Sequence, residues 1–154
     1  MDGVEQLPED ALELDRQVCF ALAVASRSVI GVYRPILEPL GLTHPQYLVM
    51  LALWGDSPLR FGEIADMLHL DPATLSPLVK RLEQSGLVER LPAEGDDRTF
   101  CLAPTAAGTA LRERALSVPP AVIERLGLPV ERLMALRDDL AIVIDAVERS
   151  GRAG

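Results

Sequence analysis

The spacing of hydrophobic residues between positions 59 and 103 predicts two short helices followed by a β-hairpin. Apolar residues recur at about the helical period of 3.6 in two segments; they are Phe61, Ile64, Ala65 and Leu68 in the first, and Leu75, Leu78, Val79 and Leu82 in the second. Each helix therefore has one apolar side to bury. Because residues 69–71 leave room only for a tight corner, the pattern is typical of a helix-turn-helix.

Residues that favour helix ends mark the limits of the second helix. Asp71 followed by Pro72 provides an N-cap and a first-turn proline, and Gly86 is favourable just after a helix. Two apolar-rich runs and a set of turn-forming residues between them follow, at 87–91, 99–102 and 92–98. We expect a two-stranded hairpin here, which completes a winged helix-turn-helix. The alternative is an amphipathic helix pair in an ordinary core, but the position of the hairpin favours the winged module.

The second helix and the hairpin carry the candidate DNA contacts. The helix turns outward polar side chains that can reach phosphates or base edges in a major groove. Arginines lie at the two ends of the hairpin, where one can follow a narrow minor groove. The predicted DNA-binding residues are Thr74, Ser76, Lys80, Arg81, Arg90 and Arg98.

A long apolar helix is predicted before this module. Between Val18 and Ile36 apolar residues alternate in steps of four and three, which is the heptad spacing of helices that pack lengthwise. Residues 19–25 are apolar on every side, so a partner must cover them. We expect the helix to open near Pro8 and to be ended by Pro35 and by Pro39-Leu40-Gly41.

Further helices are expected on either side of the winged module. Thr43 and Gln46 form the pattern of a capping box at the start of the next helix. After the hairpin, a helix should begin at residues 105–108 and run through Leu116, with an interruption at Pro119-Pro120. A last helix should run from about 130 to 147.

These elements predict a mainly α fold with a small β-wing. We expect a single domain over residues 1–154, in which helices at about 9–40 and 105–149 form a dimerisation layer and the winged helix-turn-helix spans about 44–103. A two-fold homodimer would present its second helices to successive major grooves. Its double-stranded operator should then be a palindrome with half-sites about one helical turn apart.

The charge of the chain limits how it can bind DNA. The 154 residues carry a net charge of −8, and even residues 59–103 have five basic and eight acidic side chains, a net charge of −3. Because phosphate neutralisation drives DNA affinity, binding depends on where the basic residues lie. We expect modest general DNA affinity with a strong salt dependence.

Composition also disfavours other kinds of protein. The sequence has no run of eighteen apolar residues and its acidic start lacks the features of a signal peptide, so we expect a cytoplasmic protein without a membrane span. Cys19 and Cys101 are too few for a disulfide scaffold. No Cys/His cluster has metal-ligand spacing, so neither a metal nor another cofactor is expected.

Three stretches resemble the MarR family of winged-helix repressors, and within it the organic hydroperoxide resistance regulators. The stretches read VCFALAVASRSVIGVYRPILEPLGLTHPQYLVMLALW, LHLDPATLSPLVKRLEQSGLVER and DDRTFCLAPTAAG, and the match as a whole covers roughly residues 14–147. The resemblance implies a dimeric repressor that leaves DNA when an organic peroxide oxidises Cys19. It also implies that Tyr33 helps to hold the thiol and that Arg98 is the wing arginine.

The chain departs from the subgroup's pattern at four positions. His44 stands where the subgroup has a second tyrosine that bonds the cysteine, so the hydrogen-bond network is either altered or uses the imidazole. The three other departures, at Arg60, His69 and Pro104, are expected to be structural adjustments. The candidate thiol-bonding residues are Tyr33, His44 and Tyr47.

The chemistry of Cys19 can also be assessed from the residues alone. A cysteine in an apolar helix is more often structural than reactive, and reactivity needs donors or positive charge, which Arg16 could supply. Tyr33 lies fourteen residues further on, about 21 Å along one helix, so the two side chains cannot meet within a chain. If two copies of the helix pack antiparallel about a two-fold axis near Ser26, Cys19 of one copy lies level with Tyr33 of the other.

The second cysteine is expected to be a small strand residue. We therefore predict a one-cysteine sensor in which a small cellular thiol condenses with oxidised Cys19 and no bridge to Cys101 forms.

The leading interpretation is a DNA-binding transcription repressor released from its operator by oxidation of Cys19, and not an enzyme. A second interpretation keeps DNA binding but replaces oxidation by reversible capture of a small phenolic or apolar effector. Two others are a thiol-dependent peroxidase, which lacks any accompanying base or Cys-x-x-Cys motif, and a winged module that binds only protein.

Overall fold

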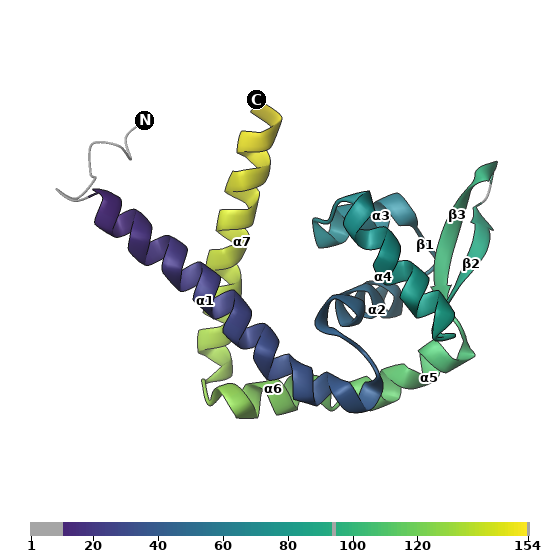
Figure 1. Ribbon diagram of the computed structural model, residues 1–154, viewed down its shortest axis with the longest axis horizontal. Coiled ribbons are helices and arrows are strands. Elements are labelled where there is room, and N and C mark those ends of the chain that lie inside the picture. Colours follow the sequence, from purple (N-terminus) through teal and green to yellow (C-terminus); the bar gives the residue numbers. More distant parts are fainter. Residues whose placement is uncertain (1–10, 94, 154) are drawn as a thin grey trace. The chain divides into compact units, whose positions relative to one another are not determined.

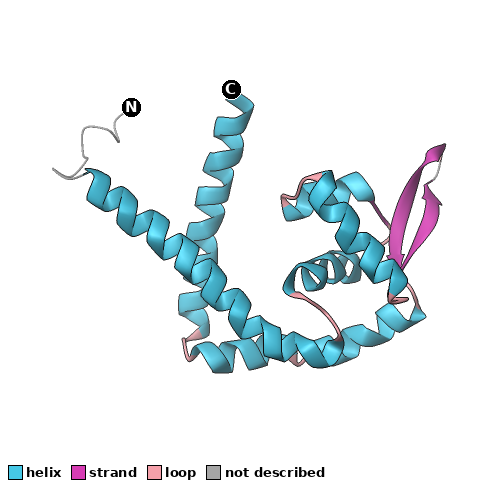
Figure 2. Ribbon diagram, in the orientation of Figure 1, coloured by secondary structure: helices cyan, strands magenta, loops and turns pink. Residues whose placement is uncertain are grey.

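The described residues form seven α-helices, one short 3-10 helix and three short strands (Figure 1, Figure 2). The computed structural model describes residues 11–93 and 95–153, with the backbone alone for residues 96–99, 152 and 153. The chain divides into two units, Met1–Leu116 and Ser117–Gly154. The predicted mainly α fold with a small β-wing is confirmed.

The first helix, α1 (Ala11–Leu37), is continuous and contains Pro35 in its last turn. A 3-10 helix, η1 (Glu38–Leu40), extends it to Gly41, where a left-handed backbone with a φ of 73° ends the element. The end predicted at residues 39–41 is confirmed, but Pro35 does not end the helix, which continues to Leu37. The predicted opening near Pro8 lies outside the described residues.

The next helix, α2 (His44–Gly55), begins with the predicted capping box. The backbone N–H of Gln46 donates to the Thr43 hydroxyl at 3.3 Å, and the backbone N–H of Thr43 donates to the Gln46 side chain at 3.0 Å. These two bonds satisfy donors that a helix start otherwise leaves unpaired.

The helix-turn-helix consists of α3 (Phe61–Leu68) and α4 (Pro72–Gln84). The corner between them turns at His69, whose φ of 53° is left-handed. Gly86 follows α4 with a φ of 77°, as a residue after the helix end should, and its N–H donates to the carbonyl oxygen of Glu83. The predicted arrangement of the two helices is therefore confirmed.

The caps of these two helices differ in detail from expectation. Asp71 is the N-cap residue of α4, but its side chain makes no capping hydrogen bond, and the N–H groups of Thr74 and Leu75 donate to its backbone oxygen instead. Arg60 occupies the N-cap of α3, where its backbone N–H donates to the Glu63 carboxylate at 3.2 Å. Glu63 thus supplies one half of a capping box that arginine cannot complete.

The wing belongs to a three-stranded sheet, so the predicted two-stranded ribbon was incomplete. The strands β2 (Val88–Ala93) and β3 (Asp96–Pro104) form the antiparallel hairpin, and β1 (Leu59–Arg60) pairs with the other edge of β3. The two residues of β1 were too few to give an alternating pattern. They pair because Leu59, opposite Leu102, buries its side chain in the core.

The helix after the wing, α5 (Ala106–Ala115), packs closely on Leu87, in the turn between α4 and β2. Its N-cap, Thr105, accepts from the N–H of Gly108, and a Cβ added at Gly108 would lie 2.1 Å from the backbone oxygen of Leu87. The Trp54 indole N–H donates to the carbonyl of Gly108 at 2.9 Å. Only glycine fits at this point.

The second unit holds α6 (Val118–Leu126) and α7 (Val130–Ala153). The predicted interruption at Pro119-Pro120 was misplaced: the chain breaks at residues 116–117, and the two prolines lie in the first turn of α6. Proline is tolerated there because first-turn N–H groups have no partner within the helix. The predicted last helix is confirmed and continues to Ala153.

The core lies in the winged module, whereas α1 leaves much apolar surface uncovered. The largest fully buried side chains of the first unit are Val49, Met50, Leu53, Ile64, Leu75, Val79, Leu82 and Leu102, together with Leu37 at the end of α1. On α1, by contrast, Phe20 is 68% exposed and Val18 is 49% exposed. Apolar patches of this kind mark interaction surfaces.

The apolar character of α1 weakens the prediction that the chain has no membrane span. By length and composition alone the segment Ala11–Leu40 could cross a membrane, with a mean hydropathy of 1.3 and 6% of its most apolar stretch buried. Core helices of soluble proteins and signal sequences share these properties. The absence of eighteen consecutive apolar residues therefore does not by itself exclude a span.

Candidate DNA-binding surface and thiol site

One face of α4 is free of contacts with the core. Leu75, Val79 and Leu82 are buried on its inner side, while the predicted DNA-binding residues on the outer side, Thr74, Ser76, Lys80 and Arg81, are all exposed. The Lys80 ammonium and Arg81 guanidinium can thus approach a phosphate backbone without breaking a core contact.

The wing holds the other two predicted DNA-binding arginines. Arg98 lies on β3, where the backbone alone is described. Arg90 on β2 differs from the α4 residues because its guanidinium is already engaged. Its Nε donates to both carboxylate oxygens of Glu83, at 2.9 and 3.0 Å.

Cys19 is exposed on α1 and has an unfavourable local charge environment. Its thiol donates to the Asp15 carboxylate, with 3.4 Å between Sγ and Oδ1. The hydrogen bond to Asp15, the charge of that carboxylate and partial desolvation raise the pKa of the Cys19 thiol. Within one chain the thiol is therefore kept protonated and less reactive.

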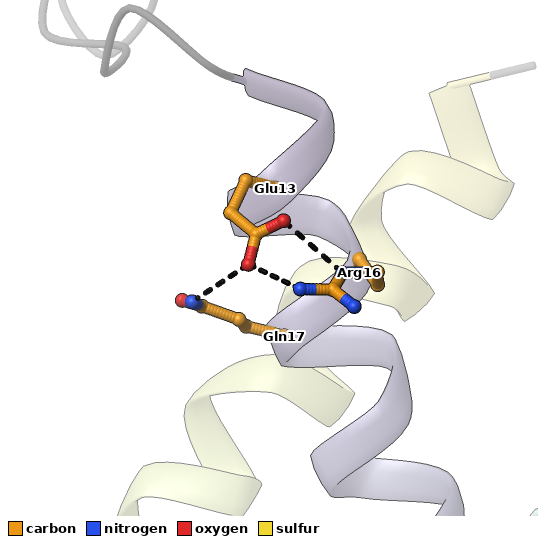
Figure 3. A network of polar contacts seen from close by, with 3 residues as sticks. All are labelled: Glu13, Arg16 and Gln17. Atoms are coloured by element: carbon orange, nitrogen blue, oxygen red, sulfur yellow. Dashed lines mark hydrogen bonds and ion pairs between the residues drawn. The ribbon is translucent and has the colours of Figure 1, made fainter.

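The predicted help from Arg16 is not found. Figure 3 shows its guanidinium turned to Glu13, with a distance of 3.1 Å from Nε to the carboxylate, and Gln17 donating to the same carboxylate at 3.2 Å. An acidic residue three positions before an arginine on an exposed helix is a ready partner. Positive charge or hydrogen-bond donors for Cys19 must come from elsewhere.

The three predicted thiol-bonding residues lie together at the other end of α1. The ring centres of Tyr33 and His44 are 4.9 Å apart in an edge-on arrangement, and those of Tyr33 and Tyr47 are 6.0 Å apart. Tyr33 comes from α1 and the other two from the start of α2, so the tight turn after η1 brings them together. We call Tyr33, His44 and Tyr47 the aromatic cluster.

Burial shifts the titration of two members of the cluster. Desolvation lowers the pKa of His44 below its ordinary value of 6.5, which keeps the imidazole neutral near pH 7. Desolvation, with a smaller effect from Tyr33, raises the pKa of Tyr47, so its hydroxyl stays protonated. The cluster therefore offers uncharged hydrogen-bonding groups, an imidazole and tyrosine hydroxyls.

A single chain does not bring the thiol to this cluster. Cys19 and Tyr33 lie on the same continuous helix, fourteen residues and about 21 Å apart. Cys101 lies on β3 beside Arg60 and Leu91, and both cysteines are free thiols.

An open groove adjoins the cluster between the end of α1 and the start of α2. It has a volume of about 550 Å³ and is lined by Ile30, Arg34, Glu38, Gly41, Leu42, Thr43, His44 and Pro45. Such a groove is large enough for a small organic molecule.

Sequence reasoning missed the partners of Cys19 and Arg90. Asp15 lies four residues before Cys19, so helical spacing could have identified it. Arg90 contacts Glu83 on α4 and the ring of Phe100 on β3, and no local spacing pattern predicts either contact.

The comparisons with known proteins agree with this architecture. The sequence profile of the MarR family matches residues 42–100. The organic hydroperoxide resistance transcriptional regulator of Bacillus subtilis strain 168 is 34% identical over 140 residues, which cover 91% of this chain and 95% of the relative.

Two solved structures are similar over most of the chain. Reduced AbfR bound to DNA is 32% identical, with a TM-score of 0.73, and covers 88% of this chain and 95% of its own. AbfR, from Staphylococcus epidermidis, has also been solved in overoxidised and disulfide-formed states. CouR from Rhodococcus jostii RHA1 bound to p-coumaroyl-CoA is 28% identical, with a TM-score of 0.71, covering 82% of this chain and 90% of its own.

These relatives are transcriptional regulators and not enzymes, as predicted from the sequence. Because a relative that is 34% identical is matched over nearly its whole length, and the winged helix-turn-helix has the family's arrangement, the chain belongs to the MarR family of DNA-binding transcriptional regulators.

Proposed function

We propose that this regulator is a cytoplasmic homodimeric repressor that leaves a palindromic operator when an organic hydroperoxide oxidises Cys19. The observation that carries the proposal is that the exposed Cys19 thiol and Tyr33 of the aromatic cluster lie far apart along one apolar helix. The similarity to an organic hydroperoxide resistance regulator and to AbfR supports it.

Antiparallel packing of two α1 helices would complete the site. With a two-fold axis near Ser26, a point seven residues from both Cys19 and Tyr33, the thiol of each chain lies level with the aromatic cluster of the other. The exposed apolar residues of α1, such as Val18 and Leu22, would be covered by the same packing. One contact between two copies thus supports both dimerisation and sensing.

The cluster would supply what Cys19 lacks in a single chain. The Tyr33 hydroxyl would donate a hydrogen bond to the sulfur, and the N–H of the neutral His44 imidazole would donate a second. Hydrogen bonds to the sulfur favour the thiolate against the opposing effect of Asp15. Tyr47 packs against Tyr33 and holds its ring in place.

The chemistry then follows from the thiolate. Its sulfur attacks the terminal oxygen of the hydroperoxide, an S–O bond forms, the O–O bond breaks and an alcohol leaves after taking up a proton. The sulfenic acid condenses with a small cellular thiol, which forms a mixed disulfide and releases water. A bulky group at this place in the dimer would change the spacing of the two α4 helices.

On DNA, the exposed face of α4 would enter the major groove, with contacts from Thr74, Ser76, Lys80 and Arg81. Arg98 on the wing would reach the adjacent minor groove. Arg90 is set apart from these residues because its guanidinium already pairs with Glu83.

The test measures operator binding by fluorescence anisotropy before and after treatment with cumene hydroperoxide and a small thiol. Wild type should lose operator binding, and mass spectrometry should show the thiol added to Cys19. Cys19→Ser should keep binding under both conditions. Cys101→Ser is the matched control and should respond as wild type does. Release of the Cys19→Ser variant by peroxide, or an internal loss of two protons in place of an added thiol, would contradict the proposal.

The groove beside His44 favours a second candidate function. Ile30 offers an apolar wall and Arg34 a positive charge, which suits reversible capture of a small phenolic or apolar effector. CouR, which binds p-coumaroyl-CoA, has a similar fold. Release of both wild type and Cys19→Ser by an aromatic acid, with no response to peroxide, would select this function.

A further inference from the structure

Arg90 links elements of the winged module that are far apart in sequence. Besides its bonds to Glu83 in the last turn of α4, its guanidinium carbon lies 4.3 Å from the centre of the Phe100 ring on β3. Phe100 in turn has its ring centre 6.1 Å from that of Phe61, the first residue of α3. These contacts connect both helices of the helix-turn-helix to both strands of the wing.

The contacts of Arg90 and Phe100 lie at the last regularly paired residues of the hairpin, just before the register shift. Arg90 pairs with Leu102 and Pro92 with Phe100, and the register shifts between Pro92 and Ala93. Beyond that shift the chain turns at Gly95, which has a φ of 82°. The tip of the wing therefore extends from the paired part of β2 and β3 that Arg90 contacts (Figure 1). The direction of the tip depends on how these two strands are attached to α4.

We propose that Glu83, Arg90 and Phe100 form a clamp that fixes the wing relative to α4, and that Arg90 is a positioning residue for DNA recognition and not a phosphate contact. The proposal rests on the DNA-facing surface proposed above. Because α4 and the wing must enter neighbouring grooves together, a wing that is free to move loses orientational freedom on binding, and this entropy cost lowers operator affinity.

The chemistry of the contacts requires arginine. The planar guanidinium can lie over an aromatic ring while its Nε–H points along its edge to a carboxylate, whereas the ammonium of lysine is a point charge without such an edge. The side chains of Arg90 and Glu83 are 48% and 27% exposed. A pair this exposed contributes little to stability, so the clamp can act on DNA binding without deciding whether the protein folds.

The decisive experiment compares Glu83→Ala with Glu89→Ala, using a labelled operator and a random duplex of equal length. Glu89 neighbours Arg90 on β2, is exposed, and points to the opposite face of the hairpin. Both changes remove one negative charge near the DNA, which by itself raises affinity for any duplex. We expect Glu83→Ala to bind operator about threefold to tenfold more weakly while random-duplex binding is not weakened. Glu89→Ala should bind operator at least as tightly as wild type.

A second variant, Arg90→Lys, keeps the positive charge and removes the planar edge. It should lose as much operator affinity as Glu83→Ala, with an unchanged dependence of affinity on salt, and the double variant should lose no more than either single one. A direct contact between Arg90 and a DNA phosphate would give different results for these variants. Lysine would then bind as arginine does, and Arg90→Ala would lower the salt slope by about 0.9.

Two outcomes would overturn the clamp: tighter operator binding by Glu83→Ala, or wild-type operator binding by Arg90→Lys. Lys80→Ala separates this failure from that of the DNA-facing surface. If Lys80→Ala weakens binding to both duplexes while Glu83→Ala does not, the clamp alone is wrong. If Lys80→Ala has no effect either, the proposed surface itself is wrong.

Discussion

Apolar side chains are buried in the winged module but exposed on the first helix. In the winged module Leu53, Leu82 and Leu102 are at most 1% exposed. On α1 Phe20 and Val18 are about half exposed or more, and the only buried residue of the helix is Leu37 at its end. A single chain thus buries the apolar side chains of the winged module but leaves those of α1 exposed.

The polar contacts repeat this difference. Helices of the winged module begin and end with defined backbone hydrogen bonds, and its wing is tied down by Arg90. Around Cys19 on α1, Arg16 bonds to Glu13 and the Cys19 thiol bonds to Asp15, and both contacts are exposed and join neighbours on the same helix. The winged module therefore has its polar contacts within one chain, whereas in the proposed dimer the region around Cys19 would acquire its partners from a second copy.

The largest effect should come from a charge placed on the apolar side of α1. Leu22→Glu would bury a carboxylate between two copies, at a cost of several kcal/mol. We expect a monomer by light scattering and an operator affinity lower by on the order of 100-fold, since one half-site contact is lost. Arg27→Gln is the control, because it changes the net charge by the same amount on the opposite side of the helix. A dimeric, tightly binding Leu22→Glu protein would refute the role assigned to α1.

A smaller effect is expected within the winged module. Gly108→Ala places a methyl group 2.1 Å from the backbone oxygen of Leu87, and the displacement should lower the free energy of unfolding by about 1–3 kcal/mol. Gly62→Ala on α3 has open space around its new Cβ and should be neutral or slightly stabilising. Urea denaturation of both variants measures the difference. Equal stabilities would mean that α5 does not pack on Leu87 as described.

The smallest effect concerns His44 and pH. Because burial lowers its pKa in the folded state, the unfolded chain binds more protons as the pH falls through 6.5, and folding stability decreases with it. His44→Gln should reduce the loss of unfolding free energy between pH 7.5 and pH 5.5. His69→Asn removes the other histidine, keeps a residue that tolerates the left-handed corner, and serves as the control. An unchanged pH dependence in His44→Gln would show that the imidazole is not desolvated.

Periodicity was sufficient to predict most of the fold. The apolar spacing located α3 and α4, and the Thr43 capping box located α2, because these signals are local. The strand β1 was not predictable, since two residues show no pattern and their pairing depends on Leu102, more than forty positions away. The chain break before α6 was misplaced because proline is compatible with both a helix interruption and a helix start.

The site was predicted less completely than the fold. The aromatic cluster was identified through a resemblance and found together, and the outward face of α4 followed from the helical period. The charge partners were not identified correctly: Arg16 turned to Glu13, and Arg90 to Glu83. Sequence spacing shows which residues can meet on one helix, but it does not show which of several acidic and basic neighbours pair.

The central claim, that Cys19 of one chain meets the aromatic cluster of another, can be measured directly by crosslinking. In the Cys101→Ser background, Tyr33→Cys should give a covalent dimer on non-reducing gels after mild oxidation, because residues 19 and 33 lie level in an antiparallel pair. The same protein with Cys19→Ser added, or with Tyr33 retained, should stay uncrosslinked, since like positions are about 21 Å apart. No covalent dimer from the first variant would contradict the account.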